Sequence, residues 1–166
     1  MKDADKIGAS AFEGCTKLTE VTLKEGIQYI SSALFKGCAA EAENGMTFRV
    51  KGDSTSNILP KSVQVIRSNA FQEAKLDKID LTNCDKMTEI ENYGFALAAI
   101  AEIKLPENLK KLDDYAFQGA VLTSIDIPSN CTEWGASVFS QSSLTKISLP
   151  KTLEVIPQRS FRQCEF

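Results

Sequence analysis

The chain has 166 residues, and its 19 basic and 22 acidic side chains give a net charge of −3 near neutral pH. The two signs are interspersed without a basic tract, so the composition argues against a nucleic-acid partner. No apolar run of about 18 residues occurs, so membrane insertion of this segment is not expected. Histidine is absent, which removes the commonest general base and the commonest metal ligand.

Phenylalanine recurs along the chain at a nearly constant interval. The successive gaps are 23, 36, 24, 22, 22 and 22 residues, and the series is Phe12, Phe35, Phe71, Phe95, Phe117, Phe139 and Phe161. A period of about 20 to 50 residues predicts a solenoid, in which one coil cannot bury its apolar face alone and neighbouring coils share a core.

Five residues before each phenylalanine stands an apolar side chain, which predicts an inward column made of Ile7, Ile30, Ile66, Ile90, Leu112, Trp134 and Ile156. After the phenylalanine comes a segment of alternating apolar and polar residues, which predicts half-buried strands over 18–23, 76–81, 100–105, 122–127 and 144–149. Phe48 and Val50 supply the equivalent strand of the second repeat. Proline then ends the strand at Pro106, Pro128 and Pro150. The return limb is either a second short strand or an irregular extended segment.

The stretches IGASAFEGCTKLTEVTL and LDDYAFQGAVLTSIDIP resemble the BspA-like class of leucine-rich repeats. The resemblance covers essentially the whole chain and implies a β-rich solenoid of the α/β leucine-rich repeat superfold with little helix. It implies a right-handed, curved array with one parallel sheet on the concave face. It also implies a bacterial or protist protein that is extracellular or exposed at the cell surface and associated with adhesion.

The whole chain, residues 1–166, is expected to form a single array of about six to seven coils, with an irregular, expanded repeat near 36–66. The sequence begins and ends in the middle of a coil, and neither end resembles the cap that normally covers the open end of a solenoid. These features predict a fragment of a longer array. The polar N-terminus is not a signal peptide, so a targeting segment would have to lie upstream.

The sequence contains no glycine-rich phosphate loop, no nucleophile elbow and no paired-cysteine zinc spacing. We therefore expect no enzymatic activity, no cofactor and no metal. The function predicted is a non-enzymatic interaction module of an adhesion-type protein, which binds a protein or a surface polymer. One alternative is a structural spacer that presents another binding domain. The other is a carboxylate-dependent hydrolase, which no sequence motif supports.

The cysteines are expected to be structural thiols. Cys15, Cys38 and Cys164 share a column with alanine and serine, and Cys131 replaces an aliphatic residue, so Cys15, Cys38 and Cys131 are predicted to face inward. Cys84 lies in a two-residue expansion and is less constrained. A bridge between Cys15 and Cys38, which should stack in adjacent coils, is the alternative.

Two candidate binding surfaces emerge. The first is a pair of insertions around the strand of the second repeat, because insertions in repeats map to loops and loops often bind; its residues, expected to project freely, are Glu41, Asn44, Asp53, Ser54, Thr55 and Asn57. The alternative is the outward face of the strands, with Arg49, Lys78, Asp80, Glu102, Lys104, Asp126 and Lys146. Because charges on strands about 4.8 Å apart should pair with one another, the insertions are the favoured site.

Overall fold

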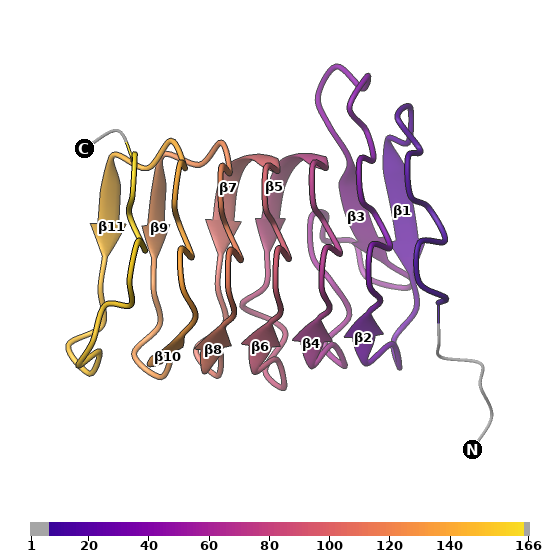
Figure 1. Ribbon diagram of the computed structural model, residues 1–166. Coiled ribbons are helices and arrows are strands. Elements are labelled where there is room, and N and C mark those ends of the chain that lie inside the picture. The colour runs from indigo at the N-terminus through magenta and orange to yellow at the C-terminus, as the bar shows by residue number, and fades with distance from the viewer. Residues whose placement is uncertain (1–6, 165–166) are drawn as a thin grey trace.

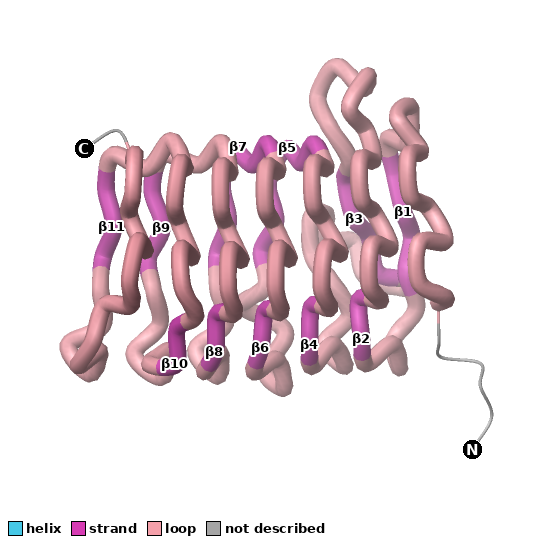
Figure 2. The backbone as a smooth tube through the Cα atoms, viewed as in Figure 1, coloured by secondary structure: helices cyan, strands magenta, loops and turns pink. Residues whose placement is uncertain are grey.

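The computed structural model describes residues 7–164 and shows coils stacked along one axis, with no helix in that part of the chain (Figure 1; Figure 2). Each coil from Phe12 to Phe139 carries a longer strand on one side and a short strand at the opposite edge, and the last described coil carries a longer strand alone. The β-solenoid predicted from the phenylalanine period is therefore confirmed.

The longer strands coincide with the predicted alternating segments. They are β1 (Glu20–Leu23), β3 (Thr47–Val50), β5 (Lys75–Asp80), β7 (Ala99–Lys104), β9 (Ser124–Asp126) and β11 (Lys146–Ser148). In β1 and β3 every second side chain is buried, as alternation predicts. The apolar side chains on the inner face of this row pack into one core with the phenylalanines.

The row of longer strands differs in one respect from the single sheet that we expected. It consists of three parallel pairs, β1–β3, β5–β7 and β9–β11. Between β3 and β5 only isolated bridges remain, at Met46–Leu76 and at Ile58–Asp80. Ile58 does not belong to β3 but follows the second insertion, so the insertion itself occupies the place where β3 would have continued the ladder to β5.

In the five coils between Phe12 and Phe139 the return limb contains a short strand, whereas in the last described coil, after β11, it is irregular. Both alternatives left open by the sequence therefore occur. The short strands are β2 (Tyr29–Ile30), β4 (Val65–Ile66), β6 (Glu89–Ile90), β8 (Lys111–Leu112) and β10 (Glu133–Trp134). They form one parallel five-stranded sheet in chain order. A continuous sheet thus runs along the edge opposite the interrupted row.

The phenylalanines form a stack through the centre of the molecule. Neighbouring rings are nearly parallel, with centroids 4.9 Å apart for Phe71 and Phe95 and 5.3 Å apart for Phe95 and Phe117. Phe35 is fully buried, whereas the first ring of the series, Phe12, and the last, Phe161, are partly exposed. In the inward column Trp134 is also only partly buried. The inward orientation predicted for Ile156 is wrong, because that side chain is 51% exposed on the last described coil, which has no further described coil beside it.

The backbone turns sharply on both sides of each phenylalanine. Two residues before the ring the chain adopts positive φ, for example 58° at Tyr93 and 61° at Tyr115, and two residues after it the angle is 56° at Leu97 and 62° at Gly119. Left-handed backbone conformations disfavour side chains with a Cβ, so the stacked coils must compensate for this cost. Tyr93 and Tyr115, which occupy equivalent positions in adjacent coils, stack with ring centroids 4.9 Å apart.

Replacement of Phe117 by alanine is expected to lower the free energy of unfolding by about 3–5 kcal/mol, because the ring is fully buried between two stacked neighbours. The same replacement at Phe161 should cost clearly less, because that ring is already partly exposed. Chemical denaturation of both variants measures the difference. Equal losses at the two positions would contradict this account of the core.

Candidate functional site

The first insertion, residues 39–45, is tied to the coils rather than projecting freely. The Lys75 ammonium donates hydrogen bonds to the carbonyls of Ala42, at 2.7 Å, and Glu43, at 2.8 Å. Glu41 accepts a hydrogen bond from the Thr16 hydroxyl at 2.9 Å and also faces an exposed lysine of the preceding coil. Asn44 is exposed. The expectation of free projection is therefore wrong for Glu41, because neighbouring coils supply partners for it.

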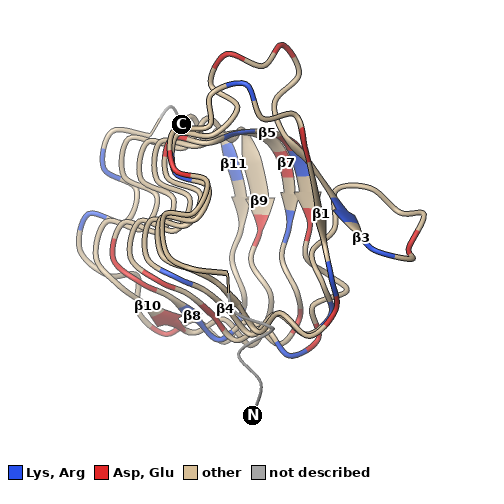
Figure 3. Cartoon of the chain, turned by 90° about the vertical axis from the view of Figure 1, so that its right-hand side faces the viewer, with Lys and Arg blue, Asp and Glu red and all other residues tan. Residues whose placement is uncertain are grey.

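The second insertion leaves the end of β3 and folds back on it (Figure 3). An antiparallel bridge joins Arg49 to Ser56, and the Asp53 carboxylate accepts a hydrogen bond from the Thr55 amide at 2.8 Å. That hydrogen bond lowers the pKa of Asp53. Asp53, Ser54 and Thr55 are exposed at the turn, as predicted. Figure 3 shows the two insertions projecting in different directions, so they do not form one surface.

Asn57 was expected to project freely with the rest of the insertion, and this prediction is wrong. The residue is only 5% exposed. Its backbone N–H donates a hydrogen bond to the Phe48 carbonyl at 2.6 Å, and its backbone carbonyl accepts one from the Asp80 N–H at 2.8 Å. Asn57 therefore sits between β3 and β5 as part of the ladder, with a φ of 61° that asparagine tolerates better than most residues.

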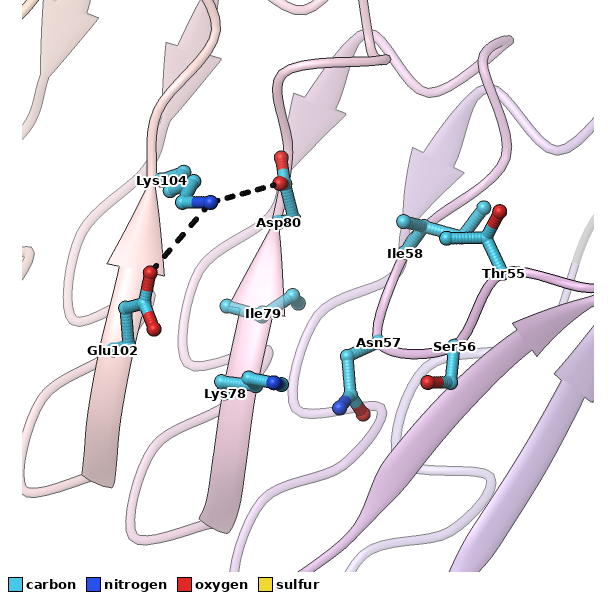
Figure 4. A pocket seen from close by; sticks show the side chains of 9 residues that line it. All are labelled: Thr55, Ser56, Asn57, Ile58, Lys78, Ile79, Asp80, Glu102 and Lys104. Carbon is cyan, nitrogen blue, oxygen red and sulfur yellow. Dashed lines mark ion pairs between the residues drawn. The ribbon is translucent and has the colours of Figure 1, made fainter.

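A pocket of about 190 Å³ lies where the end of the second insertion meets the strand row (Figure 4). The insertion contributes one wall and the outward face of β5 and β7 contributes the other, with Thr55, Ser56, Asn57, Ile58, Lys78, Ile79, Asp80, Glu102 and Lys104 as the lining residues. The two candidate surfaces that the sequence set apart therefore meet in one place. Ile58 and Ile79, which are almost fully buried, provide its apolar part.

Most of the charge in the pocket is already paired. Lys104 lies 3.6 Å from the Asp80 carboxylate on the neighbouring strand and 3.7 Å from the Glu102 carboxylate on its own strand. Partial burial raises the pKa of Asp80, but the two hydrogen bonds from Thr82 and the nearby Lys104 ammonium outweigh it, so this pKa is lowered. The pairing between strands expected for Asp80 and Lys104 is thus present.

Two polar groups in the pocket lack such partners. Lys78 lies directly opposite Glu102 in the parallel register, yet it forms no ion pair with any residue from 7 to 164, because Glu102 turns toward Lys104. The Asn57 side-chain oxygen is buried and has no hydrogen-bond partner within the described residues. A buried acceptor without a partner costs about 1–3 kcal/mol. An unpaired cation and an unsatisfied amide therefore lie on the same pocket.

The remaining residues of the predicted sheet surface lie outside this pocket. Arg49 is paired with Glu20 on β1, with 2.9 Å between the guanidinium and the carboxylate. Asp126 lines a second hollow of about 400 Å³ between β7 and β9, which Lys104 also borders. Lys146 stands on β11 opposite Ser124 and lines neither hollow. Sequence reasoning found most of the pocket residues but not Ser56, Ile58 and Ile79, because their place depends on how the insertion re-enters the row.

The cysteines are free thiols, and three of them are fully buried: Cys38, Cys84 and Cys131. Cys38 donates to the Phe12 carbonyl, with 2.9 Å between sulfur and oxygen. The inward orientation predicted for Cys15 is wrong, since that residue is exposed on the first described coil. The burial of Cys84 was not predicted. It arises because the expanded turn brings its sulfur within 3.5 Å of the Pro60 carbonyl.

Within residues 7–164 no group of three or more histidine, cysteine, aspartate or glutamate side chains is arranged to hold a metal ion. In the same residues no helix has the length and apolar character needed to cross a membrane. The ionisable groups of the pocket are two lysines, Lys78 and Lys104, and two carboxylates, Asp80 and Glu102.

The stacked parallel coils and the repeated phenylalanine turn define a leucine-rich repeat solenoid. A sequence model of the BspA type leucine rich repeat region matches residues 2–44 and 43–166 in 6 copies. The chain therefore belongs to the BspA-type leucine-rich repeat family, as the resemblance of its motifs implied.

The fold agrees with that of a solved leucine-rich repeat protein. A leucine-rich repeat protein from Bacteroides ovatus is 25% identical over 95% of this chain and 32% of its own length, with a TM-score of 0.56. A leucine rich cell surface protein from Faecalibacterium prausnitzii is 22% identical over 91% of this chain and 44% of its own, with a TM-score of 0.44. The chain spans about a third of the length of the first structure. No curated protein matches it by sequence.

The thiols should separate into two classes when the native protein is titrated with a thiol reagent. Burial raises the pKa of Cys38 to about 11 and the pKa values of Cys84 and Cys131 to about 12, so these three should react slowly. Cys15 is exposed and should be labelled quickly. Mass spectrometry of the labelled peptides measures the order. Rapid labelling of Cys84 or Cys131 in the folded protein would contradict their burial.

Replacement of Lys104 by methionine should raise the pKa of Asp80, because the ammonium is one of the groups that lower it. The ionised Asp80 stabilises the fold above its ordinary pKa of 3.8, and this contribution is lost as the pH falls through the lowered value. NMR titration of the carboxyl carbon measures the pKa in both proteins. An unchanged midpoint in the variant would show that Lys104 does not act on Asp80.

Proposed function

We propose that the chain is a non-enzymatic protein-interaction module of a cell-surface or secreted adhesion-type protein, and that it binds through the pocket between the second insertion and β5–β7. The observation that carries this proposal is the re-entry of residues 56–58 into the strand row. It creates a concave site with polar groups around apolar side chains, to which both the insertion and the strands contribute. Leucine-rich repeat proteins generally bind proteins, and the family resemblance implies exposure at the surface.

The pocket combines features of both candidate surfaces. Thr55 and Asn57 come from the insertion, whereas Lys78, Asp80 and Glu102 come from the sheet. A partner seated here would contact a backbone held by the ladder rather than a free loop, which reduces the ordering cost of binding. Glu41 and Asn44 lie on the other insertion and have no part in this proposal.

A structural spacer is the second candidate, and one observation favours it. Several charges on the strand face satisfy one another, as Arg49 does with Glu20 and Lys104 with Asp80 and Glu102. A face neutralised in this way gains little from a charged partner. The spacer hypothesis predicts that no part of this chain binds a partner on its own.

The test uses the fluorescently labelled chain on an array of purified secreted proteins and membrane-protein ectodomains. We expect saturable binding to at least one of them. A variant in which residues 51–56 are replaced by Asn-Gly-Thr keeps a residue opposite Arg49 and closes the hairpin with a three-residue loop. It should lose this binding, because it removes Thr55 from the wall and replaces Ser56. Its thermal midpoint should change little, because residues 51–56 are exposed.

The matched control is Lys146→Glu, which reverses an exposed charge on the same strand row outside the pocket. It should leave the binding unchanged. Absence of saturable binding to every ectodomain would favour the spacer. Unchanged binding after the insertion is shortened would place the contact elsewhere and contradict the proposal.

A further inference from the structure

The two unpartnered groups of the pocket differ in what they require from a ligand. The Lys78 ammonium has only hydrogens to donate and so needs an acceptor, preferably an anionic one. The Asn57 side-chain oxygen needs a donor. A ligand that satisfies both must carry an anionic group and an N–H or O–H donor close together.

The other charges in the pocket restrict the choice further. Asp80 and Glu102 both face Lys104, so this lysine is shared between two carboxylates and offers little to an incoming anion. Lys78 is the lining cation that no described carboxylate neutralises. Figure 4 shows Lys78 and Asn57 on facing sides of the pocket, with the ion-paired Asp80 and Lys104 away from them. A ligand that serves both groups would therefore lie between them, with its anionic group at Lys78 and its donor at Asn57.

The lining also bears on the class of molecule that carries the anion. None of its nine residues is aromatic, so no flat face is available on which a sugar ring could stack. The exposed hydroxyls of Thr55 and Ser56 border the opening. An extended peptide has both required groups within one residue, since an acidic side chain stands next to a backbone N–H.

We propose that the pocket binds an aspartate or glutamate residue in an extended segment of a partner protein. The carboxylate is held by Lys78, and the backbone N–H of the same residue donates to the Asn57 side-chain oxygen. That oxygen is shielded from solvent, and rotation of the amide about its broad terminal torsion turns it toward the ligand. The proposal deepens the interaction function proposed above and rests on it.

The presence of an asparagine side chain at position 57 is better explained by ligand binding than by a structural role. Its backbone holds the ladder through Phe48 and Asp80, and any residue that accepts a φ of 61° could do that. Glycine adopts this angle without strain. The side chain adds an acceptor without a partner, which is a cost to the free protein that binding would recover.

The probes for the test are acetyl-aspartate N-methylamide, its asparagine counterpart, and an aspartate probe whose backbone nitrogen is methylated. Binding to the full chain is followed by NMR through the side-chain amide of Asn57 and the backbone amide of Asp80. We expect the aspartate probe to shift both signals and to bind at least about tenfold more tightly than the asparagine probe, because it alone gives Lys78 a charged acceptor. Methylation of the backbone nitrogen should weaken binding.

Two variants assign these effects to the two groups. Lys78→Met should abolish the preference for aspartate over asparagine, whereas Lys146→Met, an exposed lysine of the same row outside the pocket, should retain it. Asn57→Gly should remove the penalty for methylation of the backbone nitrogen and should not lower the thermal midpoint. Backbone amide spectra confirm that each variant is folded.

The inference is overturned if the aspartate probe leaves the Asn57 signal unmoved, or if Lys78→Met and Lys146→Met behave alike. It is also overturned if methyl glucuronide, an acidic sugar, shifts the same signals at lower concentration than the aspartate probe. These outcomes are separate from the array experiment. Binding to an ectodomain that depends on residues 51–56, combined with no response to the aspartate probe, would keep the interaction module and reject only the ligand class.

Discussion

Stacking of one coil on the next is the interaction on which the rest of this structure depends. The phenylalanine rings lie nearly parallel through the core, with centroids between 4.9 and 5.7 Å apart. From Phe12 to Phe139 the backbone amide of each repeat phenylalanine donates a hydrogen bond to the next coil, as from the Phe95 amide to the Ala116 carbonyl at 2.8 Å. These contacts offset the left-handed backbone positions on either side of every ring. A single coil has none of these partners, so the stability of the array is shared between neighbours.

The second repeat shows how such an array can acquire a site without losing its register. The insertion after β3 adds residues, yet Phe35 and Phe71 still stack with centroids 5.5 Å apart. Phe48 packs edge-on against both rings, at 5.2 and 5.8 Å. The extra residues are absorbed on the outer side, where Asn57 and Ile58 replace β3 as the neighbour of Asp80. The interruption of the strand row between β3 and β5 and the pocket are therefore two consequences of one insertion.

Much of the fold could be predicted from the sequence, because a repeated pattern reports the same environment several times. The inward column from Ile30 to Leu112, the longer strands and the pairing of Asp80 with Lys104 all follow from register. The features that could not be predicted occur where the pattern is broken. The burial of Asn57 depends on the path of a non-repeating segment, and the exposure of Cys15 depends on which coils flank it. The candidate site lies in such a region, so its residues could be proposed but their arrangement could not.

The central claim is that the second insertion is a fixed part of the strand row and forms a ready-made wall of the pocket. Hydrogen exchange of individual backbone amides tests it most directly. The amides of Asn57 and Asp80, which bond to Phe48 and to Asn57, should exchange about as slowly as the amide of Phe95 within the core. The exposed amide of Ser54 should exchange quickly. If Asn57 and Asp80 exchange as fast as Ser54, the insertion is a mobile loop and the pocket is not preformed.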